Sequence, residues 1–225
     1  MKTDKHRIPG GGFTLVELMV TIVIVAVLAL LVATFANRAL TKAEKVTAVQ
    51  QMRDLSAGME GYIADYKRPP IPNGKSPGAN RDREPGWDTI YGDPPQPNRN
   101  YGNEAIIVPL SGDSEGVFQM DNGERFFASQ LNSKGNQYIQ FPLAIDRRNG
   151  VGDDGRLYDP WGREVIIAIN AHSVTGVPKD RKLDTYGLAE WSDRFPRFER
   201  YAFWSYGKDG VKSETLSRSD DVIFW

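Results

Sequence analysis

One acidic side chain stands inside a long apolar run near the N-terminus. The run follows the junction Gly10-Gly11-Gly12-Phe13-Thr14-Leu15-Val16-Glu17-Leu18, and residues 18–37 carry no charged side chain. A carboxylate at the start of an apolar helix costs free energy in lipid unless a partner neutralises it. Glu17 is therefore the first residue that could do chemistry, and that chemistry is charge pairing.

A second group of oxygen-bearing side chains lies near the C-terminus. Trp204-Ser205-Tyr206-Gly207-Lys208-Asp209-Gly210 is followed by Ser219-Asp220-Asp221-Val222-Ile223-Phe224-Trp225. Three aspartates beside flexible glycines repel one another, and a hard cation such as calcium would relieve that repulsion through carboxylate and carbonyl oxygens. The sequence indicates either a calcium loop or a solvated acidic turn.

Composition excludes several other kinds of site. The 225 residues include no cysteine, which excludes disulfides and thiolate chemistry, and only two histidines. The net charge of −1 gives no reason to expect a nucleic-acid partner. Phosphate-binding and dinucleotide-binding glycine motifs are absent from the sequence. We therefore expect no enzyme. The enzyme alternative is a membrane-tethered hydrolase based on aspartates, which would require Asp153, Asp154 and Asp159 to line one cleft.

The uncharged run is long enough to cross a membrane. As a helix, residues 18–37 would span about 30 Å, the thickness of the hydrocarbon core. A conventional secretory signal has a shorter apolar stretch with its cleavage site after it, and a generic uncleaved anchor would leave Glu17 unexplained. The preceding residues favour a cytoplasmic N-terminus because basic side chains outnumber acidic ones: Lys2, Lys5 and Arg7 against Asp4.

The apolar run continues into a charged but helix-forming sequence. No proline interrupts residues 10–68, so one helix of about 50 residues is predicted. Prolines then end it, and the proline- and glycine-rich residues 69–102 predict a long irregular surface segment. In the second half of the helix, apolar residues three or four positions apart predict one buried stripe: Val46, Val49, Met52, Leu55, Met59, Ile63 and Tyr66.

The remaining residues, 103–225, predict a β-rich region. Residues 138–141, 165–169 and 201–204 are β-branched or aromatic and are bounded by turn residues, which predicts three strands. Residues 105–108 could be helix or strand. The expected fold class is α+β, with a long N-terminal helix packed against a small antiparallel sheet and a long irregular insertion.

The junction and the apolar run resemble the cleavage and assembly signal of type IV pilins and of the related pseudopilins of type II secretion systems. The resemblance implies that a prepilin peptidase cuts after Gly12 and that the new N-terminal residue, Phe13, is N-methylated. It also implies that Glu17 guides assembly, because in that family the glutamate pairs with the N-terminal amine of a neighbouring subunit.

Two later segments resemble the major pseudopilin in particular. Asp159-Pro160-Trp161-Gly162 is similar to its Asp-Pro-Trp-Gly turn, in which the tryptophan is a packing anchor. The acidic C-terminal segment is similar to its calcium-binding loop. This resemblance implies calcium ligands at Asp209, Asp220 and Asp221, with Ser205 as a further candidate.

The resemblance implies a structural subunit of a periplasmic pseudopilus that assembles from the inner membrane and supports type II protein secretion. Its expected partners are further copies of itself in a helical filament, the prepilin peptidase, the inner-membrane secretion platform and minor pseudopilins. The alternative is a type IV pilus subunit acting in adhesion, motility or DNA uptake, which exposed side chains of the irregular segment would favour: Arg81, Arg83, Trp87 and Arg99. The expected divisions are a cleaved leader (1–12), a membrane and assembly helix (13–37), an amphipathic half-helix (38–68), an insertion (69–102) and the β-rich region (103–225).

Overall fold

A computed structural model describes residues 12–71, 89–92, 102–113, 115–119, 125–169, 200–213, 215 and 219–224. The chain divides into two compact units, the anchor unit (Met1–Ala43) and the folded unit (Glu44–Trp225). The elements in chain order are α1 (Leu15–Tyr66), β1 (Thr89–Tyr91), α2 (Glu104–Ser111), β2 (Val117–Gln119), β3 (Arg125–Phe127), α3 (Ala128–Leu131), β4 (Gly150–Val151), β5 (Leu157–Tyr158), β6 (Ile166–Ile169), β7 (Tyr201–Ser205) and β8 (Val222–Phe224).

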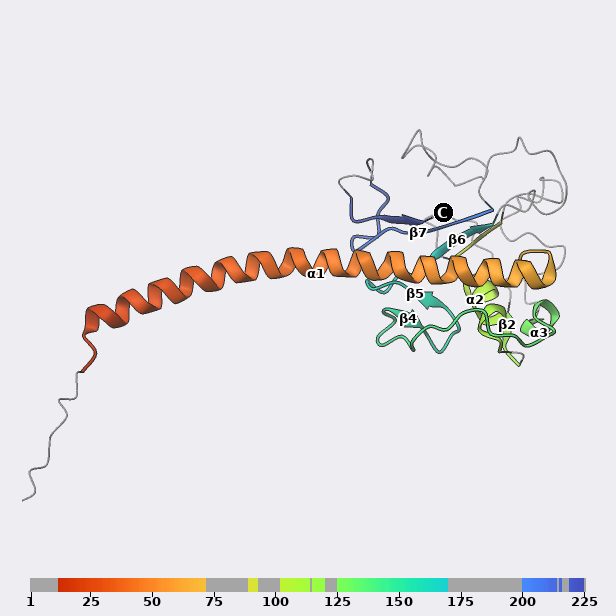
Figure 1. Ribbon diagram of the computed structural model, residues 1–225, viewed down its shortest axis with the longest axis horizontal. Coiled ribbons are helices and arrows are strands. Elements are labelled where there is room, and N and C mark those ends of the chain that lie inside the picture. The colour runs from red at the N-terminus through yellow and green to blue at the C-terminus, as the bar shows by residue number, and fades with distance from the viewer. Residues whose placement is uncertain are drawn as a thin grey trace, which may run out of the picture. The chain divides into compact units, whose positions relative to one another are not determined.

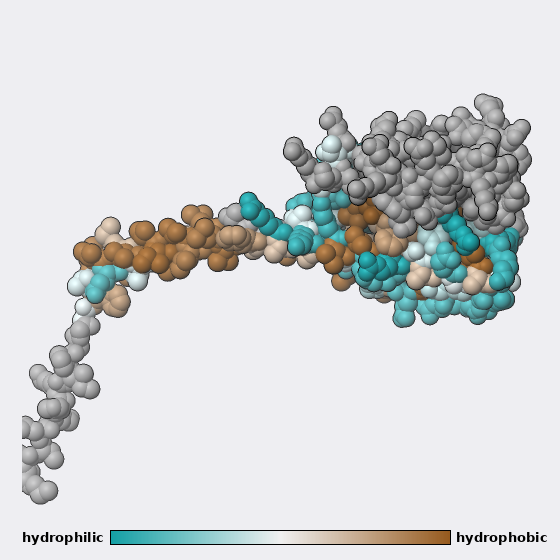
Figure 2. All heavy atoms as spheres, turned by 45° about the horizontal axis from the view of Figure 1, so that its top comes forward, coloured by the Kyte–Doolittle hydropathy of each residue, from teal (hydrophilic) through white to brown (hydrophobic). Residues whose placement is uncertain are grey.

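The long helix is confirmed. The α1 helix has 52 residues, as an uninterrupted run without proline allows. Within the anchor unit its apolar side chains are exposed, and Figure 2 shows them as a nearly continuous apolar surface. Among the described residues, α1 is the one helix long and apolar enough to cross a membrane.

The folded unit contains the core. Its largest sheet has the strand order β1-β6-β7-β8, and every pair in it is antiparallel. Two small antiparallel pairs, β2-β3 and β4-β5, lie outside this sheet. The predicted strands at 165–169 and 201–204 are confirmed as β6 and β7, and the expected α+β class is also confirmed.

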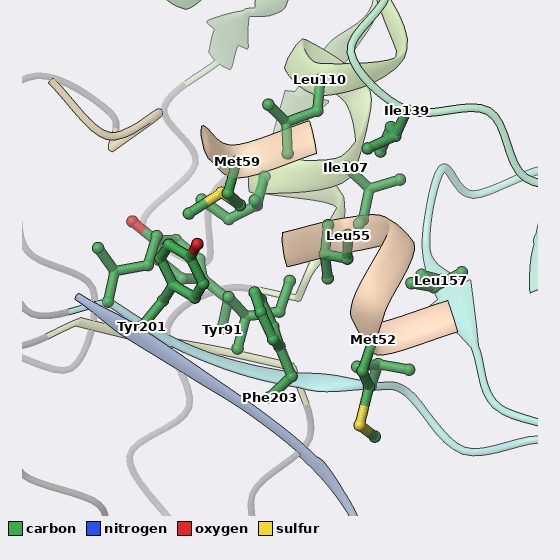
Figure 3. Packing of buried hydrophobic residues seen from close by; sticks show 14 of the residues in the cluster. Met52, Leu55, Met59, Tyr91, Ile107, Leu110, Ile139, Leu157, Tyr201 and Phe203 are labelled. Atoms are coloured by element: carbon green, nitrogen blue, oxygen red, sulfur yellow. The ribbon is translucent and has the colours of Figure 1, made fainter. Parts of the chain in front are cut away.

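The helix α1 packs between this sheet and α2 (Figure 1). Alternate residues of β7 point to opposite faces of the sheet. Tyr201 and Phe203 lie in the cluster with α1, whereas Ala202 and Trp204 lie in a second cluster on the other face. Figure 3 shows the α1 side chains meeting those of α2 and the sheet. Each fully buried side chain of this size contributes about 1.5–3 kcal/mol through burial.

The buried stripe of α1 differs in part from the predicted one. Met52, Leu55 and Met59 are fully buried as expected, but Val46 is 62% exposed. The stripe instead continues through Ala48 and Tyr62, which are fully buried. Both patterns have helical spacing, so periodicity alone did not reveal which residue begins the packed face.

The predicted strand at 138–141 is wrong. The amides of Tyr138 and Ile139 donate to the carbonyl of Leu110, at the end of α2, and not to a neighbouring strand. This segment passes so close to α1 that a Cβ at Gly58 would lie 2.9 Å from the Tyr138 carbonyl oxygen. The close packing of this segment therefore explains why residue 58 of the helix is glycine: any side chain there would clash.

Residues 105–108, which the sequence left open as helix or strand, lie in α2, whose side chains are mostly buried. The prediction that residues 69–102 form only irregular structure is wrong at one short stretch. Within the segment predicted as irregular, β1 pairs with the edge of β6, and Tyr91 is fully buried. Strand β8 was not predicted from the sequence, because three residues are too few to show a strand pattern; it forms by pairing with β7.

Candidate functional site

The N-terminus of α1 is a reciprocal hydrogen-bonded cap. The backbone amide and the hydroxyl of Thr14 donate to Oε2 of Glu17 over 2.9 and 2.8 Å, and the Glu17 amide donates back to the Thr14 hydroxyl over 3.2 Å. A threonine followed three residues later by glutamate is a capping box, which satisfies orphan amides at a helix start. Glu17 therefore has local partners within its own chain.

This cap does not depend on the leader. Cleavage after Gly12 would convert the Phe13 nitrogen to an amine but leave the Thr14 amide intact, so every cap donor survives. A side chain added at Gly12 would meet no described atom within 4 Å, so packing gives no reason for glycine there. Phe13 itself is 78% exposed. Both hydrogen bonds from Thr14 are accepted by Oε2 of Glu17. Within the described part of the chain, Oε1 of Glu17 accepts no hydrogen bond and could accept one from another donor.

The C-terminal loop is held by its own carboxylates. Oδ2 of Asp220 accepts from the amides of Lys208 and Asp209 over 2.6 and 3.1 Å. Oδ1 of Asp209 accepts from the Val211 amide over 2.8 Å. Gly207 has a φ of +64°, and a Cβ there would lie 2.6 Å from the Asp220 carbonyl oxygen, so only glycine fits. The aspartates predicted as ligands thus also shape the turn.

Asp221 differs from its neighbours because it is buried, with 5% of its surface exposed. Its Oδ2 accepts from the Ser213 amide over 3.0 Å. Its Oδ1 is buried and has no hydrogen-bond partner within the described residues. A buried carboxylate oxygen without a partner is costly, so this atom is a natural point for a cation to bind.

Ser205, the fourth predicted ligand, is engaged elsewhere. Its hydroxyl is fully buried, donates to Oδ2 of Asp159 and accepts from the Gly207 amide over 3.0 Å. Oδ1 of Asp159 accepts from the amides of Trp161 and Arg163, each over 2.9 Å. Burial raises the pKa of the Asp159 carboxyl above its usual value, although these hydrogen bonds act in the opposite direction.

Asp209, Asp220 and Asp221 all lie in the segment between β7 and β8, whereas Ser205 is the last residue of β7. Across the described ranges, no three histidine, cysteine, aspartate or glutamate side chains lie together as a metal group. A calcium ion at this loop would have to use backbone carbonyls besides the carboxylates, as calcium sites commonly do. Among the carboxylate oxygens of these three aspartates, Oδ1 of Asp221 is the one that is buried without a hydrogen bond within the described residues.

The Asp-Pro-Trp-Gly turn joins two parts of the folded unit. The indole Nε1 of Trp161 donates to Oε2 of Glu44 over 2.9 Å, so the turn is fixed to α1. Through Asp159 the same turn is fixed to Ser205 at the end of β7. This agrees with a structural role for the turn.

The three aspartates of the hydrolase alternative have different surroundings. Asp159 is fully buried and bonded as described above. Asp154 is exposed, and its Oδ2 accepts from the hydroxyl of Tyr158 over 2.6 Å. Asp153 is exposed in the same turn as Asp154. One of the three is thus buried in a structural hydrogen-bond network, while the other two are exposed in a turn.

Sequence reasoning missed two positioning residues. Thr14 could have been found from its spacing to Glu17, which is that of a capping box. Asn103 gave no such signal: it is fully buried, and its amide donates to the carbonyls of Leu157 and Val165 over 2.8 and 2.9 Å. Several residues named from the sequence lie outside the described residues: Arg81, Arg83, Trp87, Arg99 and Trp225.

Comparison with known proteins identifies the N-terminal segment. Residues 11–33 match the family model of the prokaryotic N-terminal methylation motif. No curated protein and no solved structure matched this chain. The motif implies processing by a prepilin peptidase and filament assembly in general. Combined with the long apolar helix and the small antiparallel sheet, it supports a subunit of the type IV pilin and pseudopilin superfamily.

Proposed function

We propose that this chain is a structural subunit of a periplasmic pseudopilus that assembles from the inner membrane and supports type II protein secretion. The observation that carries the proposal is the start of α1. A methylation motif there places Gly12 and Phe13 directly before an exposed apolar helix, with Glu17 in the first turn. Exposed apolar side chains of this extent require lipid or other helices around them.

Assembly would exchange lipid contacts for helix contacts. In the membrane, Thr14 satisfies one oxygen of Glu17 and lowers the cost of keeping that carboxylate in an apolar region. In the filament, the methylated amine of Phe13 from a neighbouring subunit would reach Oε1. Two charges that are each unfavourable in lipid neutralise one another only when subunits meet in the correct register.

Calcium would stabilise the C-terminal loop. Asp209, Asp220 and Asp221 are the proposed ligands, completed by backbone carbonyls of the same loop. The partnerless oxygen of Asp221 supports this assignment. Ser205 would act through Asp159, because its hydroxyl already bonds to that carboxylate. The ion would neutralise repulsion between the carboxylates and hold the loop against β7.

The secretion role rests on the Asp-Pro-Trp-Gly turn and the acidic loop, and the alternative is a type IV pilus subunit. A deletion strain distinguishes them. We expect loss of protein secretion with retained surface pili, twitching and DNA uptake. Loss of pili with normal secretion would instead identify a pilus subunit. Complementation with the wild-type chain, but not with Glu17→Leu, links either phenotype to assembly.

A further inference from the structure

Two adjacent residues of α1 make polar contacts that lead to the C-terminal loop, the segment between β7 and β8. Nζ of Lys45 donates to the carbonyl oxygen of Ser219 over 2.5 Å. Oε2 of Glu44 accepts from the indole of Trp161 over 2.9 Å. Both hydrogen bonds are partly buried, which strengthens them relative to bonds exposed to water. Glu44 and Lys45 are the first two residues of the folded unit.

The contact of Lys45 is made directly beside proposed calcium ligands. Ser219 immediately precedes Asp220 and Asp221 in the chain. Oδ1 of Asp221 is the buried oxygen that accepts no hydrogen bond within the described residues. A cation on that oxygen would restrain the backbone of residues 219–221. It would therefore also restrain the carbonyl oxygen to which Lys45 donates.

The contact of Glu44 reaches the same loop through buried groups. The backbone amide of Trp161 donates to Oδ1 of Asp159 over 2.9 Å, and Oδ2 of Asp159 accepts from the Ser205 hydroxyl. That hydroxyl accepts in turn from the Gly207 amide over 3.0 Å. Asp159 and Ser205 are fully buried. The Asp-Pro-Trp-Gly turn thus links α1 to the first residues of the C-terminal loop.

Gly207 leads directly into the region of the proposed ligands. The next two amides, of Lys208 and Asp209, donate to Oδ2 of Asp220 over 2.6 and 3.1 Å. Arg163, which follows the Asp-Pro-Trp-Gly turn, donates through its guanidinium to the carbonyl oxygen of Asp209 over 3.1 Å. The contacts of Glu44 and Lys45 therefore belong to one closed series that passes through the turn, the end of β7 and the C-terminal loop.

We propose that Lys45 and Trp161 are positioning residues for the calcium ion, and that ion binding in turn fastens the C-terminal loop and the turn to α1. Contacts that order the ligands in advance lower the ordering cost of binding. Coupling between two sites is reciprocal, so bound calcium stabilises the contacts at residues 44 and 45 by the factor by which they tighten calcium binding. The calcium concentration thereby regulates how firmly α1 is held at these residues. The inference rests on the calcium loop proposed above.

The sign of a charge effect separates this role from a purely electrostatic one. Lys45 is positive, so if it acted on the ion through its charge alone, its removal would strengthen calcium binding. If it positions the loop, its removal weakens calcium binding. The variant Trp161→Phe removes the indole donor without changing any charge, so weaker binding by that variant also has no electrostatic origin.

Calcium titration of the full-length chain in detergent, followed by isothermal titration calorimetry, tests the coupling. Lys45→Met and Trp161→Phe should each raise the Kd for calcium about fivefold. Lys42 is exposed on the same helix three residues earlier, so Lys42→Met is the matched control. Its Kd should be the same as that of the wild type or slightly lower. A variant that loses stability but stays folded, as circular dichroism verifies, would keep the Kd of the wild type if residues 45 and 161 had no positioning role.

Amide hydrogen exchange of the wild type gives a second readout at α1 itself and needs no variant. Calcium chloride, compared with magnesium chloride, should slow exchange several-fold in a peptide covering residues 44–49. Residues 57–64, farther along α1, should exchange at the same rate in both salts. An equal exchange rate of residues 44–49 in the two salts, or calcium binding by Lys45→Met or Trp161→Phe as tight as that of the wild type, would overturn the coupling while the calcium loop stands. If the wild type binds no calcium, the calcium loop itself is overturned, and the coupling with it.

Discussion

The hydroxyl of Thr14 lies 2.8 Å from Oε2 of Glu17, within the first turn of a helix in which residues 18–37 carry no charge. The glutamate that the filament would use is thus held in a defined rotamer before any neighbour arrives. Pre-positioning of this kind reduces the ordering that assembly must impose on the side chain.

Replacing Thr14 with alanine should loosen this turn. The change removes one donor to Glu17 and the acceptor for the Glu17 amide, at a cost of about 1 kcal/mol. Amide hydrogen exchange of Glu17 and Leu18 in lipid nanodiscs should then become several-fold faster. Thr14→Ser keeps the hydroxyl and should exchange as the wild type does. Equal protection in the alanine and serine variants would show that the cap contributes nothing.

Asp159 and Ser205 should behave as one unit. Asp159→Asn should lower the free energy of unfolding by about 1–3 kcal/mol, because it disturbs a buried carboxylate that accepts three hydrogen bonds. Ser205→Ala should cost a similar amount, and the double variant should lose less than the sum. Denaturant unfolding measures all three, with the exposed Asp153→Asn as a near-neutral control. Strict additivity would contradict the coupling.

Calcium removal should destabilise the C-terminal loop. A chelator is expected to lower the Tm of the full-length chain in detergent by about 5–10 °C. This is the shift expected when the free calcium concentration before chelation is about a hundredfold above the Kd of the site. Asp220→Asn should abolish this response, whereas Asp153→Asn should retain it. If the Tm of the wild type is the same with chelator and with calcium, the loop is only a solvated turn.

Stability should fall at alkaline pH. Burial raises the pKa of Tyr62 from 10.0 to about 12, and Tyr158 and Tyr201 are raised to about 12 as well. Between pH 10 and 12 the unfolded tyrosines lose protons that the folded ones keep. Their contribution to stability is therefore complete below pH 10 and is lost as the pH rises towards 12.

The variant Tyr62→Phe separates the ionisation of this tyrosine from its packing. At pH 7 the variant should have a free energy of unfolding about 1 kcal/mol below that of the wild type, because it lacks the 2.8 Å hydrogen bond to the Leu131 carbonyl. This difference in free energy of unfolding should narrow above pH 10, because residue 62 of the variant has no proton to lose there. Urea unfolding at pH 7 and pH 11 measures both. A constant difference would contradict ionisation of this buried tyrosine.

The elements whose formation depends on neighbouring residues in the chain could be predicted from the sequence. The absence of proline and the length of the apolar run sufficed for α1, and β-branched runs sufficed for β6 and β7. The segment at 138–141 has the same composition, but its amides bond to Leu110 and it packs against Gly58. Its state depends on partners far away in the chain, which periodicity does not contain.

The candidate sites divide in the same way. Thr14 and Glu17 are three residues apart, so their contact could be read from the sequence. Ser205 and Asp159 are 46 residues apart, and only the packed turn brings them together. Ser205 therefore resembled a calcium ligand in sequence although its hydroxyl bonds to a buried carboxylate.

The central claim is that this chain is cut after Gly12 and assembled through its new N-terminus. Mass spectrometry of the N-terminal peptide from cells that contain the prepilin peptidase tests it most directly. We predict a peptide that begins at Phe13 and carries one methyl group on its amine, and accumulation of the uncut precursor in cells without the peptidase. A mature chain that retains Met1, or one that begins beyond residue 37, would contradict it.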